Sequence, residues 1–481
     1  MSAPTTAELR RRRDAAEGAD LVELRLDSVS DADVAAALAG RRCPVIVTCR
    51  PTWEGGAFAG SEEERLGLLE QALQLGAEYV DVEWKAAFAG LVASAPDRIV
   101  LSSHDFSGVP HDLAERARHM AGIRPGVVKL AVKADRLSDS LRLMELRPLF
   151  GGRQRSVLIA MGDAGVATRV LAGRFGSAWS YAGAARGIGQ IDAALLVSQF
   201  RYRSLTPATE VYGVVGRPVA HSMSPAMHNA AFAATGIDAV YLPLAAADVD
   251  DFLSFARGIG LQGASVTIPY KTDLLGHVQL VDEVTRRTGA LNTLKRDGET
   301  WAGRNTDLEG FLQPLRDRQV PLTGRRVSIL GAGGSARSVA LALASHGAAI
   351  TVHARDAEKA ARVASIVNGA VGPMPPLAGS WDVLVNCTPI GMHPRVADTP
   401  VPASALAGSV VYDLVYNPQE TRLLRDATTA GCETIGGLDM LVAQAEAQFE
   451  WWTGRRPPSG VMRAAASARL SEFKVNDDHV V

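Results

Sequence analysis

The sequence predicts an α/β protein with two consecutive parallel-sheet units, of which the first is an eight-stranded barrel. Three observations carry this prediction. Up to about residue 203, seven β-rich runs alternate with alanine-rich helical stretches, which is the order that parallel strands with crossover helices require. The polar, proline-containing stretch SLTPATE follows at 204–210 and has the composition of a linker. A second series of strands and helices then begins at Val211.

Composition limits the class of protein and of partner. A chain of 481 residues with 47% hydrophobic and 21% charged residues is globular and too long for one ordinary core. Lysine plus arginine (50) nearly balance aspartate plus glutamate (52), so no overall field favours nucleic acid or an anionic membrane. The four cysteines form no CxxC pair, which argues against disulfides and structural zinc. We expect a cytoplasmic protein that uses no metal and binds small molecules, with a homodimer as one open outcome.

The first 203 residues predict a (β/α)8 TIM barrel. The seven runs lie at Leu21–Leu26, Val45–Cys49, Tyr79–Trp84, Arg98–Ser102, Val127–Val132, Ser156–Met161 and Ala178–Tyr181. Closure needs an eighth strand, and the only stretch that offers one is Met1–Thr5. We therefore expect the first strand of the barrel to be short or missing.

Charged residues alternate with apolar ones in several of these runs, as around Glu23, Asp81 and Lys129. In an isolated segment, this alternation is typical of an antiparallel strand with one face in water. In a parallel barrel, helices cover the outer face, so the apolar residues point outward and the charges converge inside. Because buried charges are costly unless they are paired or bind a ligand, their convergence at the carboxyl ends of strands predicts a site.

Seven short motifs occur in order along this unit. They are ELRLD at Glu23–Asp27, TCR with EGG at Thr48–Arg50 and Glu54–Gly56, DVE at Asp81–Glu83, SSHDF at Ser102–Phe106, VKLAV around Lys129, MGDAGVATR ending at Arg169, and GQ at Gly189–Gln190. No single motif is decisive, but the ordered set is specific and resembles the type I 3-dehydroquinate dehydratases. The resemblance covers nearly all of residues 1–203.

The resemblance implies a Schiff-base mechanism for this unit. Lys129 would condense with the substrate ketone, His104 would transfer the proton, and Glu83 would orient His104. Substrate would be bound by Glu23, Arg25, Arg50, Arg169 and Gln190, and the three arginines would also lower the pKa of Lys129. One residue departs from the pattern: Arg186 stands four residues before Gln190, where family members commonly have serine. The loop there is expected to bind substrate differently.

A strand, a glycine turn and a helix at Arg325–His346 predict a dinucleotide site in the second unit. RVSILGAGGSAR places Gly331, Gly333 and Ala336 directly after an apolar strand, where the helix N-terminus can hold a pyrophosphate. The next strand ends at Arg355 rather than at an acid. Arginine there favours the 2′-phosphate of NADP(H), although the adjacent Asp356 leaves NAD open.

Seven further motifs extend over the second unit. They are GRPVAHSMSPAMHN at Gly216–Asn229, GASVTIPYK at Gly263–Lys271, GALNTL at Gly289–Leu294, GRNTD at Gly303–Asp307, NCTPIGM at Asn386–Met392, YDLVYNP at Tyr412–Pro418 and GLDMLVAQA at Gly437–Ala445. This set resembles shikimate dehydrogenase. It implies a substrate-binding domain at 211–310 that a helical part at about 437–470 completes, a Rossmann NADP-binding domain at 311–436, and a flexible tail at 471–481.

The second resemblance also implies site residues. Lys271 and Asp307 would supply and fix the proton that the reduced ketone needs. Substrate would be bound by Ser222, Ser224, Thr267, Asn292, Tyr416 and Gln444. The cofactor would be bound by Gly331, Ala332, Gly333, Gly334, Ser335, Ala336, Arg355, Asn386, Thr388, Gly391, Met392 and Gly437.

The two resemblances support each other, because 3-dehydroshikimate, the product of the first reaction, is the ketone of the second. They imply a bifunctional enzyme of the shikimate pathway. Three alternatives stay open at this point: an NAD-dependent quinate or shikimate oxidoreductase, a barrel that is only a scaffold or binding module, and a class I aldolase that uses the same lysine chemistry.

Overall fold

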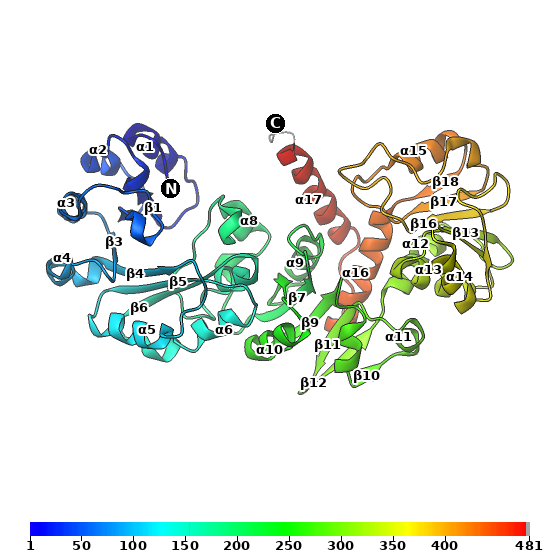
Figure 1. Cartoon of the computed structure of the whole chain (residues 1–481), viewed down its shortest axis with the longest axis horizontal. Helices are drawn as coiled ribbons and strands as arrows, with labels where there is room; N and C mark the ends of the chain where they lie inside the picture. The colour runs from blue at the N-terminus through cyan, green and yellow to red at the C-terminus, as the bar shows by residue number, and fades with distance from the viewer. Residues whose placement is uncertain (153, 478–481) are drawn as a thin grey trace. The chain divides into compact units, whose positions relative to one another are not determined.

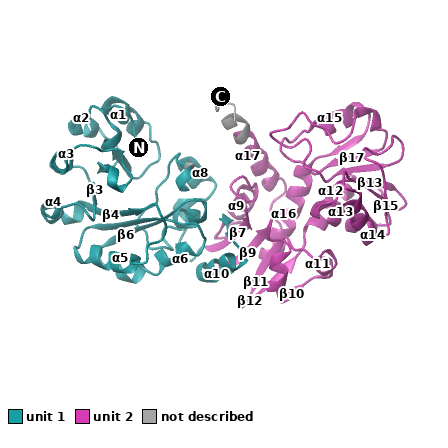
Figure 2. Cartoon of the chain, viewed as in Figure 1, with its two compact units in different colours: residues 1–209, 242–260 teal, residues 210–241, 261–481 magenta. Residues whose placement is uncertain are grey.

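The structure is a computed structural model that describes residues 1–152 and 154–477, without the side chains of residues 186 and 473–477. The chain divides into two compact units (Figure 2). The first contains residues 1–209 and 242–260, and the second contains the remainder. Residues 242–260 therefore group with the first unit, although they lie within the range expected for the substrate-binding domain.

Six parallel strands follow one another in chain order in the sheet of the first unit (Figure 1). They are β1 (Val22–Arg25), β2 (Val45–Thr48), β3 (Tyr79–Glu83), β4 (Ile99–Asp105), β5 (Val127–Lys133) and β6 (Arg155–Met161). The runs predicted at Met1–Thr5 and Ala178–Tyr181 do not form strands. Parallel bridges instead join Ser2 to Arg25 and Ser177 to Ser156 at the two edges. The strand order is that of a (β/α)8 barrel whose first and last positions are reduced to single bridges.

Helices alternate with these strands and cover their outer sides. They are α1 (Thr6–Asp14), α2 (Val34–Leu38), α3 (Glu62–Gln74), α4 (Ala89–Ser94), α5 (Leu113–Gly122), α6 (Asp139–Met144), α7 (Val166–Val170) and α8 (Ala193–Ser198). In β5, Val128, Leu130 and Val132 are almost fully buried, and α5 packs against this strand. The residues that alternate with them face the interior, where Val127 and Ala131 belong to one apolar cluster. Lys129 lies between these two on the same face.

The second unit begins with a mixed six-stranded sheet in the order β10-β12-β11-β9-β7-β8. Its strands are β7 (Glu210–Gly216), β8 (Ala239–Ala245), β9 (Leu261–Val266), β10 (Leu280–Val281), β11 (Thr293–Asp297) and β12 (Thr300–Arg304). The helices along this stretch of the chain are α9 (Ser224–Thr235), α10 (Val249–Ile259), α11 (Glu283–Thr288) and α12 (Asp307–Asp317), and of these α10 groups with the first unit. The neighbouring strands β7 and β9 are parallel, so Gly216 and Val266 end at the same edge of the sheet.

The third sheet is parallel, in the order β15-β14-β13-β16-β17-β18. The strands are β13 (Arg326–Leu330), β14 (Ala349–His353), β15 (Ala370–Val371), β16 (Val383–Asn386), β17 (Val410–Asp413) and β18 (Glu433–Ile435). Counted from β13, this is the 3-2-1-4-5-6 order of the Rossmann fold. The helices are α13 (Gly334–Ala344), α14 (Ala357–Ile366) and α15 (Arg422–Thr429).

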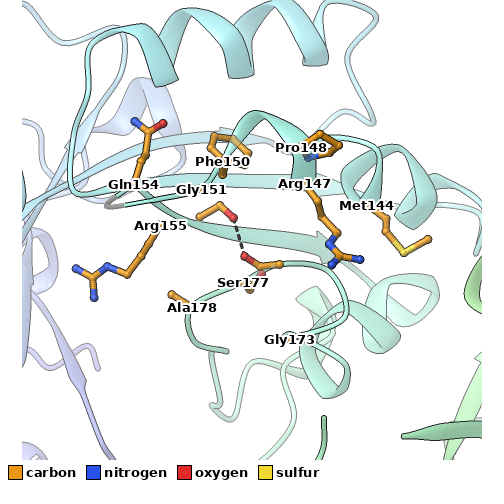
Figure 3. Close-up of a pocket in the computed structure, with 12 residues that line it drawn as sticks. Met144, Arg147, Pro148, Phe150, Gly151, Gln154, Arg155, Gly173, Ser177 and Ala178 are labelled. Carbon is orange, nitrogen blue, oxygen red and sulfur yellow. Dashed lines mark hydrogen bonds between the residues drawn. The ribbon is translucent and has the colours of Figure 1, made fainter. Parts of the chain in front are cut away.

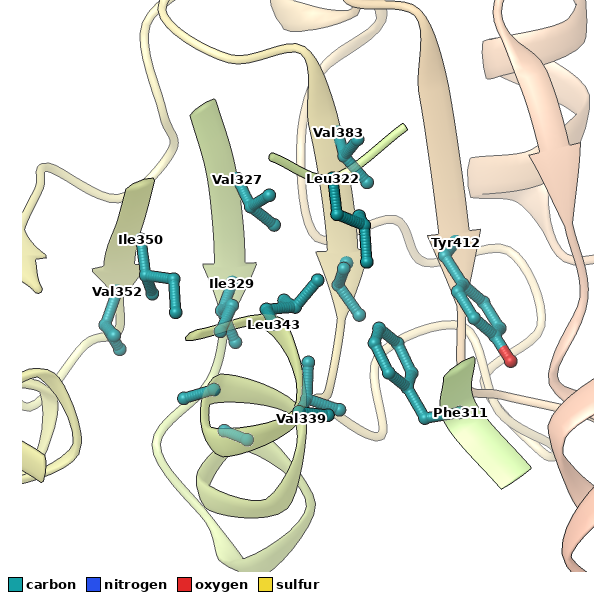
Figure 4. Packing of buried hydrophobic residues seen from close by; sticks show 14 of the residues in the cluster. Phe311, Leu322, Val327, Ile329, Val339, Leu343, Ile350, Val352, Val383 and Tyr412 are labelled. Atoms are coloured by element: carbon teal, nitrogen blue, oxygen red, sulfur yellow. The ribbon is translucent and has the colours of Figure 1, made fainter. Parts of the chain in front are cut away.

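The apolar core of this domain lies between the sheet and α13 (Figure 4). Val327 and Ile329 of β13 face Val339 and Leu343 of the helix. At one side of the core, the ring of Phe311 stacks on that of Tyr412 with centroids 4.9 Å apart and 10° between the planes. Phe311 belongs to α12, so this helix is anchored on the domain with the Rossmann strand order.

Two helices complete the chain: α16 (Gly437–Thr453) and α17 (Val461–Asp477). The first packs against α12, β9 and α9, and the second packs against α9. Residues 471–477, which were expected to belong to a flexible tail, continue α17, and 478–481 lie outside the described residues. Over residues 1–152 and 154–477, no helix is long and apolar enough to cross a membrane.

Candidate active sites

Lys129 lies inside the barrel with its side chain only 5% exposed. Its Nζ is 3.2 Å from Oδ2 of Asp81 on β3 and 3.7 Å from Oε1 of Glu23 on β1. The ring centroid of Tyr181 lies 4.4 Å from the same nitrogen. The predicted convergence of charges is therefore confirmed, because groups from three strands meet at one amine.

The pKa of Lys129 differs from the expectation. Burial of the amine lowers its pKa, but Glu23, Tyr181 and Asp81 outweigh burial and Arg50, so the pKa is raised. Arg50 lowers the pKa of Lys129, as predicted, but the expected net lowering of this pKa does not occur. The physical reason is distance: two carboxylates lie within 3.7 Å of Nζ, and Arg25 and Arg50 are themselves paired with acids. The resting form of Lys129 is an ammonium.

His104, on β4, contacts Glu54 and not the expected Glu83. Oε1 of Glu54 accepts a hydrogen bond from the backbone N–H of His104 at 2.9 Å and lies 3.1 Å from Nδ1 of its ring. Burial lowers the pKa of His104 well below 6.5, and Arg50 and Lys129 lower it further. The imidazole is therefore neutral at neutral pH, with Nε2 available as a base.

Glu83 has other partners. Its two oxygens are bound by Arg50, at 2.8 Å, and by Arg65 of α3. The contact with His104 that was expected of Glu83 is thus made by Glu54, which sequence reasoning quoted only as part of the EGG motif. Burial raises the pKa of Glu54 to about 7, so its ionisation lies close to neutral pH.

The three predicted arginines differ in their partners. Arg50 binds Asp81 at 3.0 Å as well as Glu83, and Arg25 makes two hydrogen bonds of 2.7 Å to Asp27. Arg169 is 3% exposed, and among the described residues it bonds only the carbonyls of Tyr181, at 3.4 Å, and Ile188, at 2.9 Å. Burial lowers the pKa of Arg169 to about 10. It is a buried cation that lacks a described counter-ion.

Gln190 lies in a loop that a bridge between Ala182 and Ile191 closes. Its Oε1 accepts a hydrogen bond from the backbone N–H of Ala185 at 3.1 Å, so it is held within its own loop in this structure. The loop also approaches Arg169 through Ile188. The side chain of Arg186, the departure noted in the sequence, lies outside the described part of the chain.

One pocket of the first unit lies away from this chemistry (Figure 3). It measures about 640 Å³ and lies at the amino end of β6, with Arg147, Phe150 and Arg155 among its walls. Its walls include none of the predicted dehydratase residues. Because barrels carry their chemistry at the carboxyl ends of strands, we do not assign the reaction to this pocket.

A pocket of about 380 Å³ in the second unit collects the second predicted site. Its walls include all eight predicted catalytic and substrate-binding residues of this unit, namely Ser222, Ser224, Thr267, Lys271, Asn292, Asp307, Tyr416 and Gln444. Ser335 and Gly437, expected at the cofactor, line the same pocket. The first turn of α13, which directly follows the glycine turn, and the polar groups therefore share one cavity.

Lys271 and Asp307 form an ion pair in this pocket. Nζ of Lys271 donates to Oδ2 of Asp307 at 2.6 Å, and Nδ2 of Asn292 donates to Oδ1 at 2.7 Å. Asp307 is the first residue of α12, where the helix dipole favours a carboxylate. The side chain of Lys271 is 34% exposed and that of Asp307 is 18% exposed. The ammonium thus reaches the cavity while the carboxylate is held on both oxygens.

Helix α16 presents one face to the pocket. Gly437, Met440, Leu441, Gln444 and Gln448 all line it, at the spacing of one side of an α-helix. Sequence reasoning found Gln444 but missed Gln448, whose Nε2 donates to the carbonyl of Asn292 at 3.2 Å. It also missed Ser265, whose hydroxyl donates to Oε1 of Gln448 at 2.6 Å. The position of Gln448 four residues after Gln444 could have indicated it.

The glycine turn has room for a diphosphate. Gly331 has a φ of +106°, and a Cβ there would lie 3.1 Å from the Thr388 side chain. Around Gly333 and Gly334 nothing lies within 4 Å of an added Cβ. Helix α13 begins at Gly334 and has no side-chain cap, so its first N–H groups can bind phosphate oxygens. The residues present therefore fit a dinucleotide, although none is part of the structure.

The loop after β16 faces Gly331 through Thr388. Oδ1 of Asn386 accepts hydrogen bonds from the N–H and the hydroxyl of Thr388, and Asn386 donates to Asp413 at 2.8 Å. Further along, Gly391 has a φ of +94° and Met392 is 44% exposed. The structure thus ties Asn386 and Thr388 together beside the glycine turn.

Arg355 is exposed in the bend that follows β14. Its neighbour Asp356 caps α14: its Oδ1 accepts from the backbone N–H of Lys359 at 3.0 Å, and its Oδ2 lies 3.3 Å from Nζ of Lys359. Both carboxylate oxygens of Asp356 thus already contact Lys359. This leaves Arg355 as the charged group available to a ligand at this strand end.

Three family models match the chain. The type I 3-dehydroquinase model matches residues 1–207, the shikimate dehydrogenase substrate binding domain matches 214–294, and the shikimate 5'-dehydrogenase C-terminal domain matches 437–466. The chloroplastic bifunctional 3-dehydroquinate dehydratase/shikimate dehydrogenase of Arabidopsis thaliana is 32% identical over 477 residues, which cover 92% of this chain and 79% of that protein.

The second unit has relatives of its own. The shikimate dehydrogenase (NADP(+)) of Moorella thermoacetica is 43% identical over 270 residues, which are 53% of this chain and 92% of that one. The crystal structure of shikimate 5-dehydrogenase from Thermus thermophilus with NADP(H) and shikimate matches with a TM-score of 0.50 and 33% identity, over 54% of this chain and 99% of that one. This chain belongs to the family of bifunctional enzymes in which a type I 3-dehydroquinate dehydratase is followed by a shikimate dehydrogenase.

Proposed function

We propose that the first unit dehydrates 3-dehydroquinate to 3-dehydroshikimate through a Schiff base on Lys129. The single observation that carries this proposal is the enclosure of the Lys129 amine, 5% exposed, together with two carboxylates and a neutral imidazole. A scaffold would not need this arrangement, because an enclosed cluster of charges is costly unless it serves a ligand.

The charges of this site suit the sequence of steps. The Lys129 ammonium gives one proton to a neighbouring carboxylate, and the free amine adds to the ketone. Loss of water, with return of that proton, leaves an iminium, so the nitrogen carries one positive charge before and after these steps and is neutral between them. The iminium makes the adjacent C–H acidic.

Neutral His104 takes the proton of this C–H bond, and the electron pair of the bond moves toward the iminium nitrogen. His104 then returns the proton to the departing hydroxyl, which leaves as water. Hydrolysis of the new conjugated iminium frees 3-dehydroshikimate and Lys129. Glu54 holds the Nδ1 side of His104, so that Nε2 performs both transfers.

Arg169 is the group in this site best suited to the substrate carboxylate. It is buried and charged at neutral pH, and it lacks an acid partner among the described residues. A carboxylate would supply the missing counter-ion through charge-assisted hydrogen bonds. Arg25 and Arg50 are already bound to acids, which makes them more suited to shaping the site.

The second unit reduces 3-dehydroshikimate to shikimate. NADPH bound at the glycine turn would supply the hydride. Lys271 lies in the pocket with its ammonium on Asp307, and it donates a proton to the ketone oxygen as negative charge develops there. Asn292 and Asp307 fix its position. Ser222, Ser224, Thr267, Tyr416 and Gln444 surround the space left for a polyol, and an analogue that lacks a hydroxyl would leave such groups without a partner.

The preference for NADPH over NADH rests on Arg355. Its exposed guanidinium can bind a 2′-phosphate, while Asp356 is bonded to the start of α14. An NAD-dependent oxidoreductase would instead need an acid free to bind the 2′-hydroxyl.

The test is a two-step assay on the purified full-length protein. With 3-dehydroquinate and NADPH, we expect shikimate to form after a transient of 3-dehydroshikimate. NADH in place of NADPH should give a slower second step. Borohydride added with 3-dehydroquinate should attach the substrate carbon skeleton to Lys129. An active reductase with no adduct at Lys129 and no dehydration would contradict the first part and favour a scaffold. Carbon–carbon cleavage would favour an aldolase.

A further inference from the structure

Tyr181 lies against the Lys129 amine, but it belongs to none of the motifs that define the dehydratase site. Its ring centroid is 4.4 Å from Nζ. The hydroxyl of Tyr181 is buried. The indole N–H of Trp179 acts on it as a hydrogen-bond donor and lowers its pKa, but the proton of Tyr181 itself has no acceptor among the described residues. Buried donors normally have an acceptor. An aromatic face on a cation beside an unused donor is the arrangement expected where a ligand is still to bind.

The backbone holds Tyr181 in this place. Its carbonyl accepts a hydrogen bond from Arg169 at 3.4 Å, and the loop that carries Gln190 begins at the next residue, where Ala182 bridges to Ile191. Tyr181 therefore stands between Arg169, which we propose binds the substrate carboxylate, and the loop that carries Gln190. Burial raises the pKa of Tyr181 to about 12, so its hydroxyl remains a donor at neutral pH.

We propose that Tyr181 is a further substrate-contacting residue of the dehydratase site. Its ring faces the positive nitrogen of the Schiff base, and its hydroxyl donates a hydrogen bond to an oxygen of the polyol substrate. This inference rests on the proposed dehydratase function. The nitrogen is charged both as an ammonium and as an iminium, and an aromatic face stabilises such a cation against its neutral forms. In the iminium, this stabilisation maintains the charge that draws electrons from the neighbouring C–H bond.

Ring and hydroxyl make separable predictions. The groups that act on the Lys129 charge from the surrounding elements are Glu23 of β1, Arg50 after β2, Asp81 of β3, His104 of β4, Tyr181, and the amino group of Met1. Tyr181→Leu removes the ring as well as the hydroxyl, so the Lys129 pKa should fall. Tyr181→Phe keeps the ring and should leave that pKa in place.

The experiment measures borohydride trapping of 3-dehydroquinate on the full-length protein as a function of pH, together with kcat/KM for dehydration. For Tyr181→Phe we expect kcat/KM to fall about 10-fold, as for the loss of one hydrogen bond, with an unchanged midpoint of trapping. For Tyr181→Leu we expect the midpoint to move down by about 1 pH unit. The matched control is Tyr79→Phe, which removes a hydroxyl bonded to Arg155 at the opposite end of the barrel.

The outcomes separate this inference from the function on which it rests. If wild-type protein neither dehydrates 3-dehydroquinate nor forms an adduct at Lys129, the dehydratase function itself fails. If wild type does both and Tyr181→Phe keeps its full kcat/KM, the inference fails while the function stands. An unchanged midpoint in Tyr181→Leu refutes the part assigned to the ring. Far-UV circular dichroism and reduction of 3-dehydroshikimate check that each variant is folded. If Tyr181→Leu does not fold, the kcat/KM of Tyr181→Phe alone decides whether the inference holds.

Discussion

Replacing Arg169 with methionine should separate stability from activity in the barrel. In the folded protein, burial lowers the pKa of Arg169 from 12.5 to about 10, which corresponds to about 3 kcal/mol of cost for the charged form. Because the folded pKa is the lower one, this cost is fully present at every pH below about 10, including neutral pH. Methionine keeps the apolar stem and removes the charge.

Removing the buried charge should stabilise the fold, but the loss of two hydrogen bonds opposes this gain in stability. Arg169 donates to the carbonyls of Tyr181 and Ile188, and each bond contributes about 1 kcal/mol. The net expectation for Arg169→Met is a change in the free energy of unfolding near zero, or a gain of about 1 kcal/mol. Loss of the partner for the substrate carboxylate should at the same time raise KM for 3-dehydroquinate and lower kcat/KM by about 100-fold, equivalent to about 3 kcal/mol.

Urea denaturation followed by circular dichroism measures the free energy of unfolding, and the dehydration rate as a function of substrate concentration measures KM and kcat/KM. Arg174→Met is the matched control. Arg174 also bonds only backbone carbonyls among the described residues and its pKa is also lowered by burial, but it is not part of the predicted site. Its replacement should leave KM unchanged. The reasoning is refuted if Arg169→Met destabilises the protein by more than about 2 kcal/mol while KM stays at its wild-type value.

Three further predictions follow from the two sites. Lys129→Ala should abolish use of 3-dehydroquinate and spare reduction of 3-dehydroshikimate, and Lys271→Ala should do the reverse; loss of both activities in either folded variant would disprove independent sites. Because Glu54 ionises near pH 7, dehydration should rise as the pH increases through 7. Glu54→Gln should flatten this rise and lower kcat about 10-fold, whereas Glu62→Gln, a change in a half-exposed acid bound to Arg65, should do neither. Arg355→Ala should raise KM for NADPH about 10-fold and leave KM for NADH unchanged, as initial rates with each cofactor would show.

The sequence predicted which residues meet, but not every pair that they form. Lys129, Asp81 and Glu23 were placed together because strand alternation and burial leave only the barrel interior for charges. The partner of His104 could not be found in this way. Glu83 and Glu54 both lie near the strand ends, and the choice between them depends on Arg65, a fully buried arginine of α3 that no local pattern distinguishes.

The direction of the Lys129 pKa was missed for a similar reason. Counting arginines along the sequence ignores that Arg25 and Arg50 bind acids, so their net effect on the amine is small beside two carboxylates at contact distance. The barrel edges were uncertain because a single bridge needs no recognisable run of apolar residues. The second site was easier to predict from the sequence, because its motifs lie at strand ends and helix starts, where topology alone brings them to one cavity. Cytoplasmic location and a homodimer stay predictions.

The pocket face of α16 constrains length as well as sequence. Gly437 starts the helix with its Cα against the backbone of Leu414 and Val415, where a side chain would overlap, and Gln444 lies two turns further on. Inserting or deleting one residue between them would turn everything downstream by about 100° and shift it by about 1.5 Å. Gln444 and Gln448 would then leave the cavity together. Surface loops accept such insertions readily. In this segment of α16, an insertion should abolish reduction of 3-dehydroshikimate, even if every residue that lines the cavity were retained.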